Sequence, residues 1–245
     1  MFVLKKQEDI LFIILYIVMS YALLLFIIIA VVSYAVQASL QSKFKRYSQI
    51  PIPNGMTGRD VADKMLRDNG ISDVKVTATR GQLTDNFNPS TMTVNLSEGV
   101  FASNSVAAAA VAAHECGHAV QHNQEYAPLK MRSALVPVVS FASRWMSWVL
   151  LAGILTIQVF PQLLLAGIIL FAMTTLFSFI TLPVEINASK RALVWLDSAG
   201  ITNHETHDMA KDALKMAAYT YVVAALGSLA TLVYYIMIFL GGRRD

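Results

Sequence analysis

The feature that most constrains this chain is the length of its stretches without charged residues. Residues 10–36 are 27 consecutive uncharged residues, residues 145–183 are 39, and residues 216–240 are 25. A helix needs about 20 apolar residues to cross a bilayer, and the first stretch is too long for a cleaved secretory signal. Pro161 interrupts the longest stretch, because proline lacks an amide donor and disfavours helix at the residue before it. The chain is therefore predicted to form four transmembrane helices, over 10–36, 134–160, 162–184 and 216–240.

The composition agrees with a membrane protein. Of the 245 residues, 56% are hydrophobic and 14% are charged, whereas an average soluble domain has about 25% charged residues. An ordinary soluble enzyme and a disordered chain are therefore excluded. The net charge of +3 is too small to indicate nucleic-acid binding. The single cysteine, Cys116, excludes an internal disulfide.

The distribution of basic residues predicts the orientation of the four helices. An even number of spans places both termini on one side of the membrane, together with four of the 19 Lys and Arg residues. The other 15 lie on the opposite side, several of them close to the ends of the spans. The positive-inside rule therefore predicts that this second side is cytoplasmic.

Residues 37–133 are predicted to form a small domain outside the bilayer, with residues 185–215 as a shorter second segment. Thr57 is a good helix N-cap, and the apolar residues that follow it recur at helical spacing. Residues 104–122 are rich in alanine and contain no proline. They predict a second helix of this domain, capped by the polar pair 103–104.

Two segments of the same domain are predicted to be strands. Residues 74–79 and residues 92–96 alternate in polarity, which is typical of half-buried strands. Residues 86–90 lie between them and contain asparagine, proline and serine. This composition predicts a turn.

The predicted helix 104–122 contains the sequence His114-Glu115-Cys116-Gly117-His118, which follows the pattern H-E-x-x-H. Residues i and i+4 share one face of a helix, so both imidazoles can reach one zinc ion. Glu115 lies beside that face, where it can take a proton from a metal-activated water molecule instead of binding the metal. The alternative is a chance match, which is expected in about one chain in 500 of this composition. The motif therefore predicts a catalytic zinc site.

A catalytic zinc ion needs a third protein ligand and an open fourth position. Glu185 directly follows the third predicted span, and the hairpin of the second and third spans returns it to the side of the H-E-x-x-H helix. A carboxylate at the membrane end of an apolar helix is costly without a partner, and a metal cation is such a partner. Glu185 is therefore the predicted third ligand. The alternative is an interfacial ion pair between Glu185 and Lys190 or Arg191.

Several stretches of the sequence resemble the YugP-like family of bacterial neutral zinc metallopeptidases, which are membrane proteins. That family is more distantly similar to HtpX-type membrane proteases, which carry an E-x-x-A-D motif after H-E-x-x-H. The resemblance extends over most of the chain and is carried by Leu83-Thr84-Asp85, Leu96-Ser97-Glu98 and residues 111–115, 126–134 and 182–189.

The resemblance implies roles for individual residues. His114, His118 and Glu185 would be the ligands of one catalytic Zn²⁺ ion, and Glu115 would be the general base. Ser189 occupies the position of the aspartate in E-x-x-A-D. Ser189 is therefore the candidate residue that contacts a ligand histidine, rather than the metal, and orients its ring.

The sequence thus predicts a membrane α+β protein, with four transmembrane helices and a small zincin-like (gluzincin) metalloprotease domain at the cytoplasmic face of the plasma membrane. The predicted function is that of a membrane-embedded zinc-dependent endopeptidase. The expected partners are the lipid bilayer and a protein or peptide substrate associated with the membrane, but not nucleic acid; the oligomeric state is open. The strand at 92–96 is the predicted sheet edge against which an extended substrate would pair.

The sequence leaves two alternatives to the peptidase. A catalytically silent, zinc-stabilised membrane scaffold or adaptor would bind the metal without turnover, but it would have no use for Glu115. A small transporter would carry acidic residues within its spans, and the four predicted spans contain none. The peptidase accounts for every residue of the motif.

Overall fold

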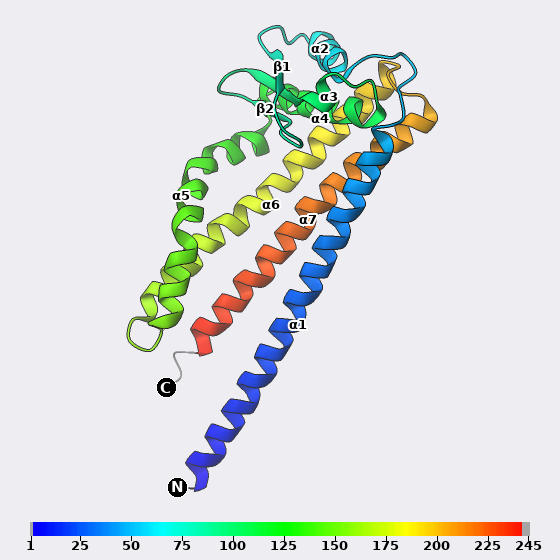
Figure 1. The fold of residues 1–245 in the computed structure, drawn as a ribbon. Coiled ribbons are helices and arrows are strands. Elements are labelled where there is room, and N and C mark those ends of the chain that lie inside the picture. Colours follow the sequence, from blue (N-terminus) through cyan, green and yellow to red (C-terminus); the bar gives the residue numbers. More distant parts are fainter. Residues whose placement is uncertain (1, 242–245) are drawn as a thin grey trace.

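The structure is a computed structural model, which describes the backbone of residues 2–241 and the side chains of residues 23–241. It is mostly helical and contains one small sheet (Figure 1). In chain order the elements are α1 (Phe2–Tyr47), α2 (Gly58–Asp68), β1 (Lys75–Thr79), β2 (Asn86–Asn88), β3 (Thr93–Ser97), α3 (Glu98–Phe101), α4 (Val106–Asn123), α5 (Ala127–Leu155), α6 (Pro161–Ser198) and α7 (His204–Gly241).

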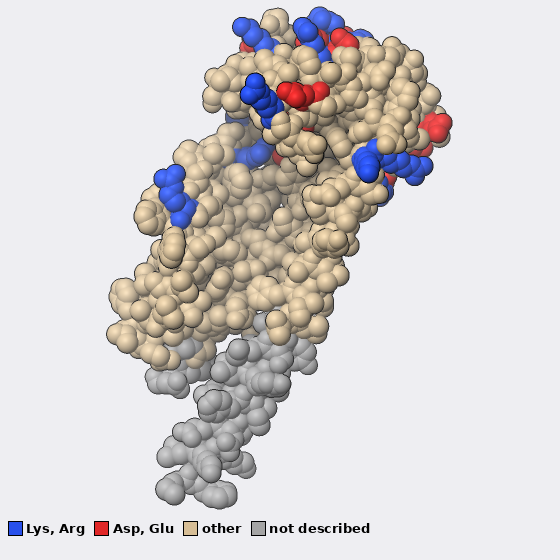
Figure 2. Space-filling view, in the orientation of Figure 1, with Lys and Arg blue, Asp and Glu red and all other residues tan. Residues whose placement is uncertain are grey.

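Four of the described helices, α1, α5, α6 and α7, are long and apolar enough to cross a membrane, in agreement with the four spans predicted from the sequence. α5 packs against α6, α6 against α7, and α7 against α1. Many of their outward-facing side chains are large and apolar. We call the part of the chain between α1 and α5, residues 48–126, the head. In Figure 2 the charged residues gather over the head at one end of the molecule, and the face of the long helices is nearly free of them. This distribution suits helices that lie in lipid.

α5 and α6 form a helical hairpin at the predicted break. α5 ends at Leu155, and α6 begins with Pro161 in its first turn, where the missing amide hydrogen of proline is not needed. A Cβ atom on Gly153 would lie 2.5 Å from the Cα atom of Leu164. Glycine therefore permits the two helices to touch through their backbones next to the turn, and the hairpin returns the chain to the head.

The head contains a three-stranded sheet in the order β1-β3-β2. β1 pairs with β3 in parallel, and β2 pairs with β3 antiparallel. β3 is therefore the central strand, and the prediction that residues 92–96 form the sheet edge is wrong. Residues 86–90, predicted as a turn, contain the edge strand β2. The reason is burial: Val94 and Leu96 of β3 are 0% exposed, whereas β2 is a short polar strand that suits an edge.

α2 begins at the predicted cap and contributes to the core of the head. The side chain of Thr57 accepts a hydrogen bond from the amide of Asp60, and the Asp60 carboxylate accepts one from the amide of Thr57. Hydrogen bonds from Thr57 to the carboxylate also lower the pKa of Asp60. Val61 and Met65 lie on the buried side of α2, in the same apolar core as the central strand. This capping box fixes where the helix starts.

α4 is the central helix of the head and packs against α2, α6 and α7. Its N-cap is Ser105, whose side chain accepts a hydrogen bond from the amide of Ala108, so the helix starts slightly later than predicted. A Cβ atom on Gly117 would lie 2.7 Å from the carbonyl oxygen of Ala188 in α6. Glycine inside the H-E-x-x-H motif therefore lets α4 approach the backbone of α6 closely.

α6 is one continuous helix across the predicted boundary between residues 162–184 and 185–215. Pro183 lies inside it and removes one backbone hydrogen bond. Such prolines are tolerated in helices of membrane proteins because neighbouring groups compensate for the lost bond. Glu185 therefore belongs to the same continuous helix that carries the third apolar segment.

Candidate metal centre

The two histidines of the H-E-x-x-H motif lie one turn apart on α4 and face α6. Nε2 of His114 lies 3.3 Å from Oε2 of Glu185, and Nε2 of His118 lies 3.5 Å from the same oxygen. The two imidazole rings are perpendicular, with centroids 4.8 Å apart. The structure thus brings together the three residues that were predicted as metal ligands.

The separations between the Glu185 oxygen and the two histidine nitrogens fit one zinc ion. Zinc binds histidine nitrogen and carboxylate oxygen at about 2.0–2.1 Å with tetrahedral geometry, which separates neighbouring ligand atoms by about 3.4 Å. The nitrogen–oxygen separations of 3.3 and 3.5 Å match this value. Two imidazoles and one carboxylate are also a donor set found in catalytic zinc sites with an open fourth position.

Glu185 lies buried beside the histidines. Its side chain is 5% exposed. Arg191, one of its alternative partners, instead donates hydrogen bonds to the side chains of Asn187 and Gln124. This arrangement favours a ligand role for Glu185 over a pair with Lys190 or Arg191 at the surface.

The charges around the cluster favour a cation. Burial lowers the pKa of His118, but its hydrogen bond with Glu185 and the negative charges of Glu115 and Glu185 outweigh burial, so the pKa is raised. Nη1 of Arg132 in α5 lies 3.4 Å from Oε1 of Glu185, on the oxygen that does not face the histidines. Arg132 therefore holds Glu185 while leaving Oε2 directed at the two imidazoles.

Each histidine is also held through its second ring nitrogen. Oγ of Ser189 lies 3.1 Å from Nδ1 of His114, and Oε1 of Gln121 lies 3.0 Å from Nδ1 of His118. A partner at Nδ1 fixes the ring orientation and leaves Nε2 free to bind a metal. Ser189, the residue predicted to orient a histidine, thus lies against His114.

Gln121 was not predicted from the sequence. Its side chain is fully buried, and its amide nitrogen donates to the carbonyl oxygen of Val184 and to Oδ1 of Asn187 in α6. It therefore joins His118 to the helix that carries Glu185. A signal was present in the sequence, because Gln121 follows His118 by three residues and so lies on the same helix face.

Replacing Gln121 with leucine should weaken zinc binding by about 10–100-fold, because His118 loses the acceptor that orients it. Competition with a chelator of known affinity measures the change. The Gln124→Leu variant is the matched control: Gln124 is exposed and accepts a hydrogen bond from Arg191 rather than from a histidine, so its loss should leave the zinc affinity unchanged. Equal zinc affinity of the wild type and both variants would contradict a positioning role for Gln121.

Glu115 lies outside the ligand cluster but opens onto the same space. Its Oε2 accepts a hydrogen bond of 3.1 Å from the backbone amide of Phe87 in β2. Together with His114, Glu185 and Tyr221, it lines a cavity of about 190 Å³. This is a suitable position for a base that acts on a molecule bound next to the ligands.

Arg132 and Tyr221 are further residues at the site that sequence reasoning missed. Tyr221 lies within the uncharged stretch 216–240, and Arg132 resembles any basic residue near the end of a span. Nothing in the local sequence distinguishes them. They reach the site only because α5 and α7 pack on either side of α6.

Comparison with known proteins identifies the family of the chain. A sequence family described as "putative neutral zinc metallopeptidase" matches residues 22–240. The "putative membrane protease YugP" of Bacillus subtilis (strain 168) is 41% identical over 213 residues, which cover 87% of this chain and 94% of the relative. No solved structure matches the chain. The family match and this relative together show that the chain belongs to the family described as "putative neutral zinc metallopeptidase".

Proposed function

We propose that this protein is a membrane-embedded, zinc-dependent endopeptidase. The observation that carries the proposal is the convergence of His114, His118 and Glu185 at separations that fit zinc, with Glu115 at the same cavity. The family and the membrane-protease relative support the same chemistry. The combination of a helical H-E-x-x-H motif with a glutamate third ligand corresponds to a zincin-like (gluzincin) domain.

The proposed mechanism assigns one task to each residue. His114, His118 and Glu185 would hold the zinc ion, which would supply a Lewis acid for the scissile carbonyl and for the attacking water. The Glu115 carboxylate takes a proton from the attacking water and delivers it to the leaving amine. The amide of Phe87, which donates to Glu115, keeps the carboxylate directed into the cavity before substrate arrives.

The sheet edge proposed to bind the substrate is β2. β2 pairs with β3 on one side only, and the amide of Phe87 in the middle of β2 points to Glu115. An extended peptide can add to such an edge through backbone hydrogen bonds. The substrate's peptide bond that pairs beside Phe87 would then lie next to the Glu115 carboxylate.

The proposed location is the plasma membrane, with the catalytic head in the cytoplasm. Four apolar helices and a membrane-protease relative support the membrane location. The cytoplasmic side follows from the excess of Lys and Arg around the head. Substrates are accordingly proteins or peptides that are presented at the membrane.

Removing the metal tests the proposed function. The purified full-length protein in detergent should cleave an unfolded model protein in zinc-containing buffer, and a zinc chelator should abolish cleavage because the residues at the site are left without their Lewis acid. Adding zinc back in slight excess should restore it. Cleavage that continues at full rate in the chelator would contradict a zinc peptidase, and zinc binding without any cleavage would support a scaffold.

A further inference from the structure

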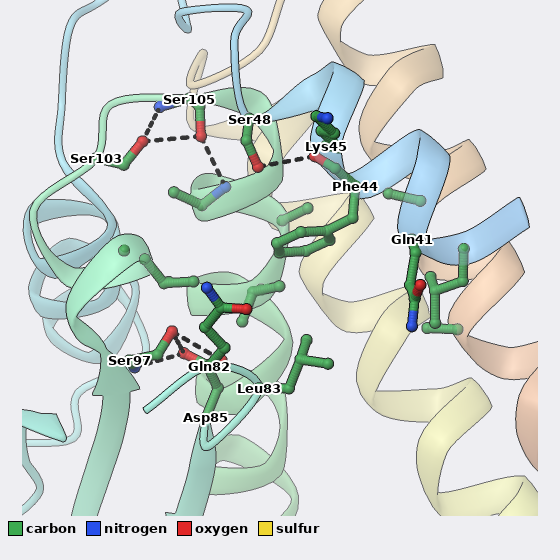
Figure 3. A pocket seen from close by; sticks show the side chains of 18 of the residues that line it. Gln41, Phe44, Lys45, Ser48, Gln82, Leu83, Asp85, Ser97, Ser103 and Ser105 are labelled. Carbon is green, nitrogen blue, oxygen red and sulfur yellow. Dashed lines mark hydrogen bonds between the residues drawn. The ribbon is translucent and has the colours of Figure 1, made fainter. Parts of the chain in front are cut away.

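A second and larger cavity lies beside the metal centre. Its volume is about 830 Å³, and its walls come from the last turns of α1, the loop 81–85, α3, α4 and α7. In Figure 3, Phe44 extends into this space from α1, and Gln82 and Leu83 extend toward it from the loop on the other side. We call this cavity the distal groove.

The distal groove is continuous with the cavity of the metal centre. The two share five lining residues: Leu83, Asp85, Val111, Leu214 and Ala217. α4 lines the distal groove from its N-cap Ser105 to Val111, where the metal cavity begins, and Glu115 lies about one turn further along the helix. The ten residues of helix from Ser105 to Glu115 correspond to about 15 Å, which is the length of about four to five residues of extended peptide.

The walls of the groove are suited to apolar side chains. Leu40, Phe44, Val111 and Leu214 form its apolar part, and uncharged glutamine and serine side chains line much of the rest. Lys45 and Asp85 are the charged residues among the described lining residues. Asp85 is engaged, because its carboxylate accepts hydrogen bonds from the amide and hydroxyl of Ser97.

Lys45 is exposed, so its ammonium group stays hydrated and does not need a partner inside the groove. A charged side chain entering the apolar part of the groove would lose hydration without gaining a partner.

Leu83 lines both cavities, at the place where they join. It is 68% exposed, although it is a large apolar residue, and its φ of 58° lies in the left-handed region that L-residues rarely adopt. Strained backbone of this kind concentrates at ligand-binding sites. A bound apolar chain would cover the Leu83 side chain and remove it from water.

We propose that the distal groove binds about four to five residues of the substrate on one side of the scissile bond and selects apolar side chains there. The proposal rests on the proposed peptidase function and names its substrate class: extended apolar segments of polypeptide. α1 and α7, two of the four helices able to cross a membrane, form one wall of the groove. An apolar segment that leaves the bilayer beside these two helices would lie close to the groove.

Equilibrium binding tests the groove without requiring turnover. The full-length Glu115→Gln protein in detergent is titrated with a fluorescent ten-residue peptide of leucine and alanine, and with a series in which lysine replaces one residue at a time. Lysine should weaken binding by at least about tenfold at about four to five consecutive positions, because a desolvated ammonium meets an apolar wall. Lysine elsewhere in the peptide should have little effect.

A charge placed in the groove should reverse this preference. Leu40 lines the groove, whereas Ser42 is an exposed residue of the same helix that does not. In the Glu115→Gln background, Leu40→Asp should make the lysine peptides bind more tightly than the parent peptide at the sensitive positions. Ser42→Asp, which adds the same charge nearby, should leave the pattern unchanged. The melting temperature of both variants shows that they are folded.

Each result decides between the groove and its alternatives. A uniform response to lysine along the peptide, or the same change in Leu40→Asp and Ser42→Asp, would overturn the proposal. Recovery of peptide binding only after bound lipid is removed would assign the groove to an acyl chain and would overturn it too. If the peptides bind as expected but the wild type cleaves none of them, the groove stands and the proposed peptidase function fails.

Discussion

Replacing Glu115 with glutamine should reduce peptide cleavage by about 10²–10⁴-fold, the usual contribution of a positioned acid–base group. Glutamine has the same size and can still accept the hydrogen bond from the amide of Phe87. It cannot take a proton from water. The cluster of His114, His118 and Glu185 is not altered by the change, so zinc should bind with the affinity of the wild type.

Two measurements on the Glu115→Gln protein are needed together. The rate of cleavage of an unfolded model protein reports the base, and the zinc content after gel filtration reports the ligands. Glu125→Gln is the matched control, because Glu125 forms an exposed ion pair with Lys130 and such pairs contribute little. Wild-type cleavage by Glu115→Gln would exclude Glu115 as the base, and loss of zinc from it would mean that Glu115 is a ligand.

Replacing Glu185 with glutamine should weaken zinc binding by more than about 100-fold, beyond the effect of losing a residue that only orients a ligand. The anionic ligand is lost, and the pocket keeps the positive charge of Arg132 without the carboxylate that offsets it. Cleavage should disappear with the metal. Because a metal that binds the folded state raises its stability, zinc should raise the melting temperature of the wild type but not of this variant.

The second prediction is checked by titrating zinc against a competing chelator while the melting temperature is recorded. Glu205→Gln is a suitable control, since Glu205 is exposed in the first turn of α7 and far along the chain from the ligands. Zinc affinity equal to that of the wild type in Glu185→Gln would exclude Glu185 as a ligand. The ion pair with Arg132 would then be the better account of this residue.

Much of the architecture follows from local sequence. Long stretches without charged residues form helices in lipid, because a helix satisfies its own backbone hydrogen bonds there. Pro161 marks the hairpin because it cannot continue a helix from the preceding turn. The pattern H-E-x-x-H predicts a shared helix face because that face is a property of one element. The same holds for the capping residue Thr57.

The mistaken predictions concern contacts between elements. The alternation of residues 92–96 is the same in a central strand and in an edge strand, so only pairing with β1 and β2 decided that β3 lies in the middle. Residues 86–90 carry turn-forming side chains, but pairing with β3 makes a strand of part of them.

The sequence by itself determined the family, the number of apolar helices and the candidate ligands, because these depend on motifs, on the lengths of the uncharged stretches and on the order of the spans along the chain. Only the tertiary structure decided which side chains surround the ligands. Gln121 and Arg132 are ordinary polar residues until α4 and α5 pack against α6. Likewise, the closeness of α4 to α6 depends on what lies opposite Gly117. Which residues share a helix face depends on residues close together in the chain. Which helix packs against that face depends on residues far apart in the chain.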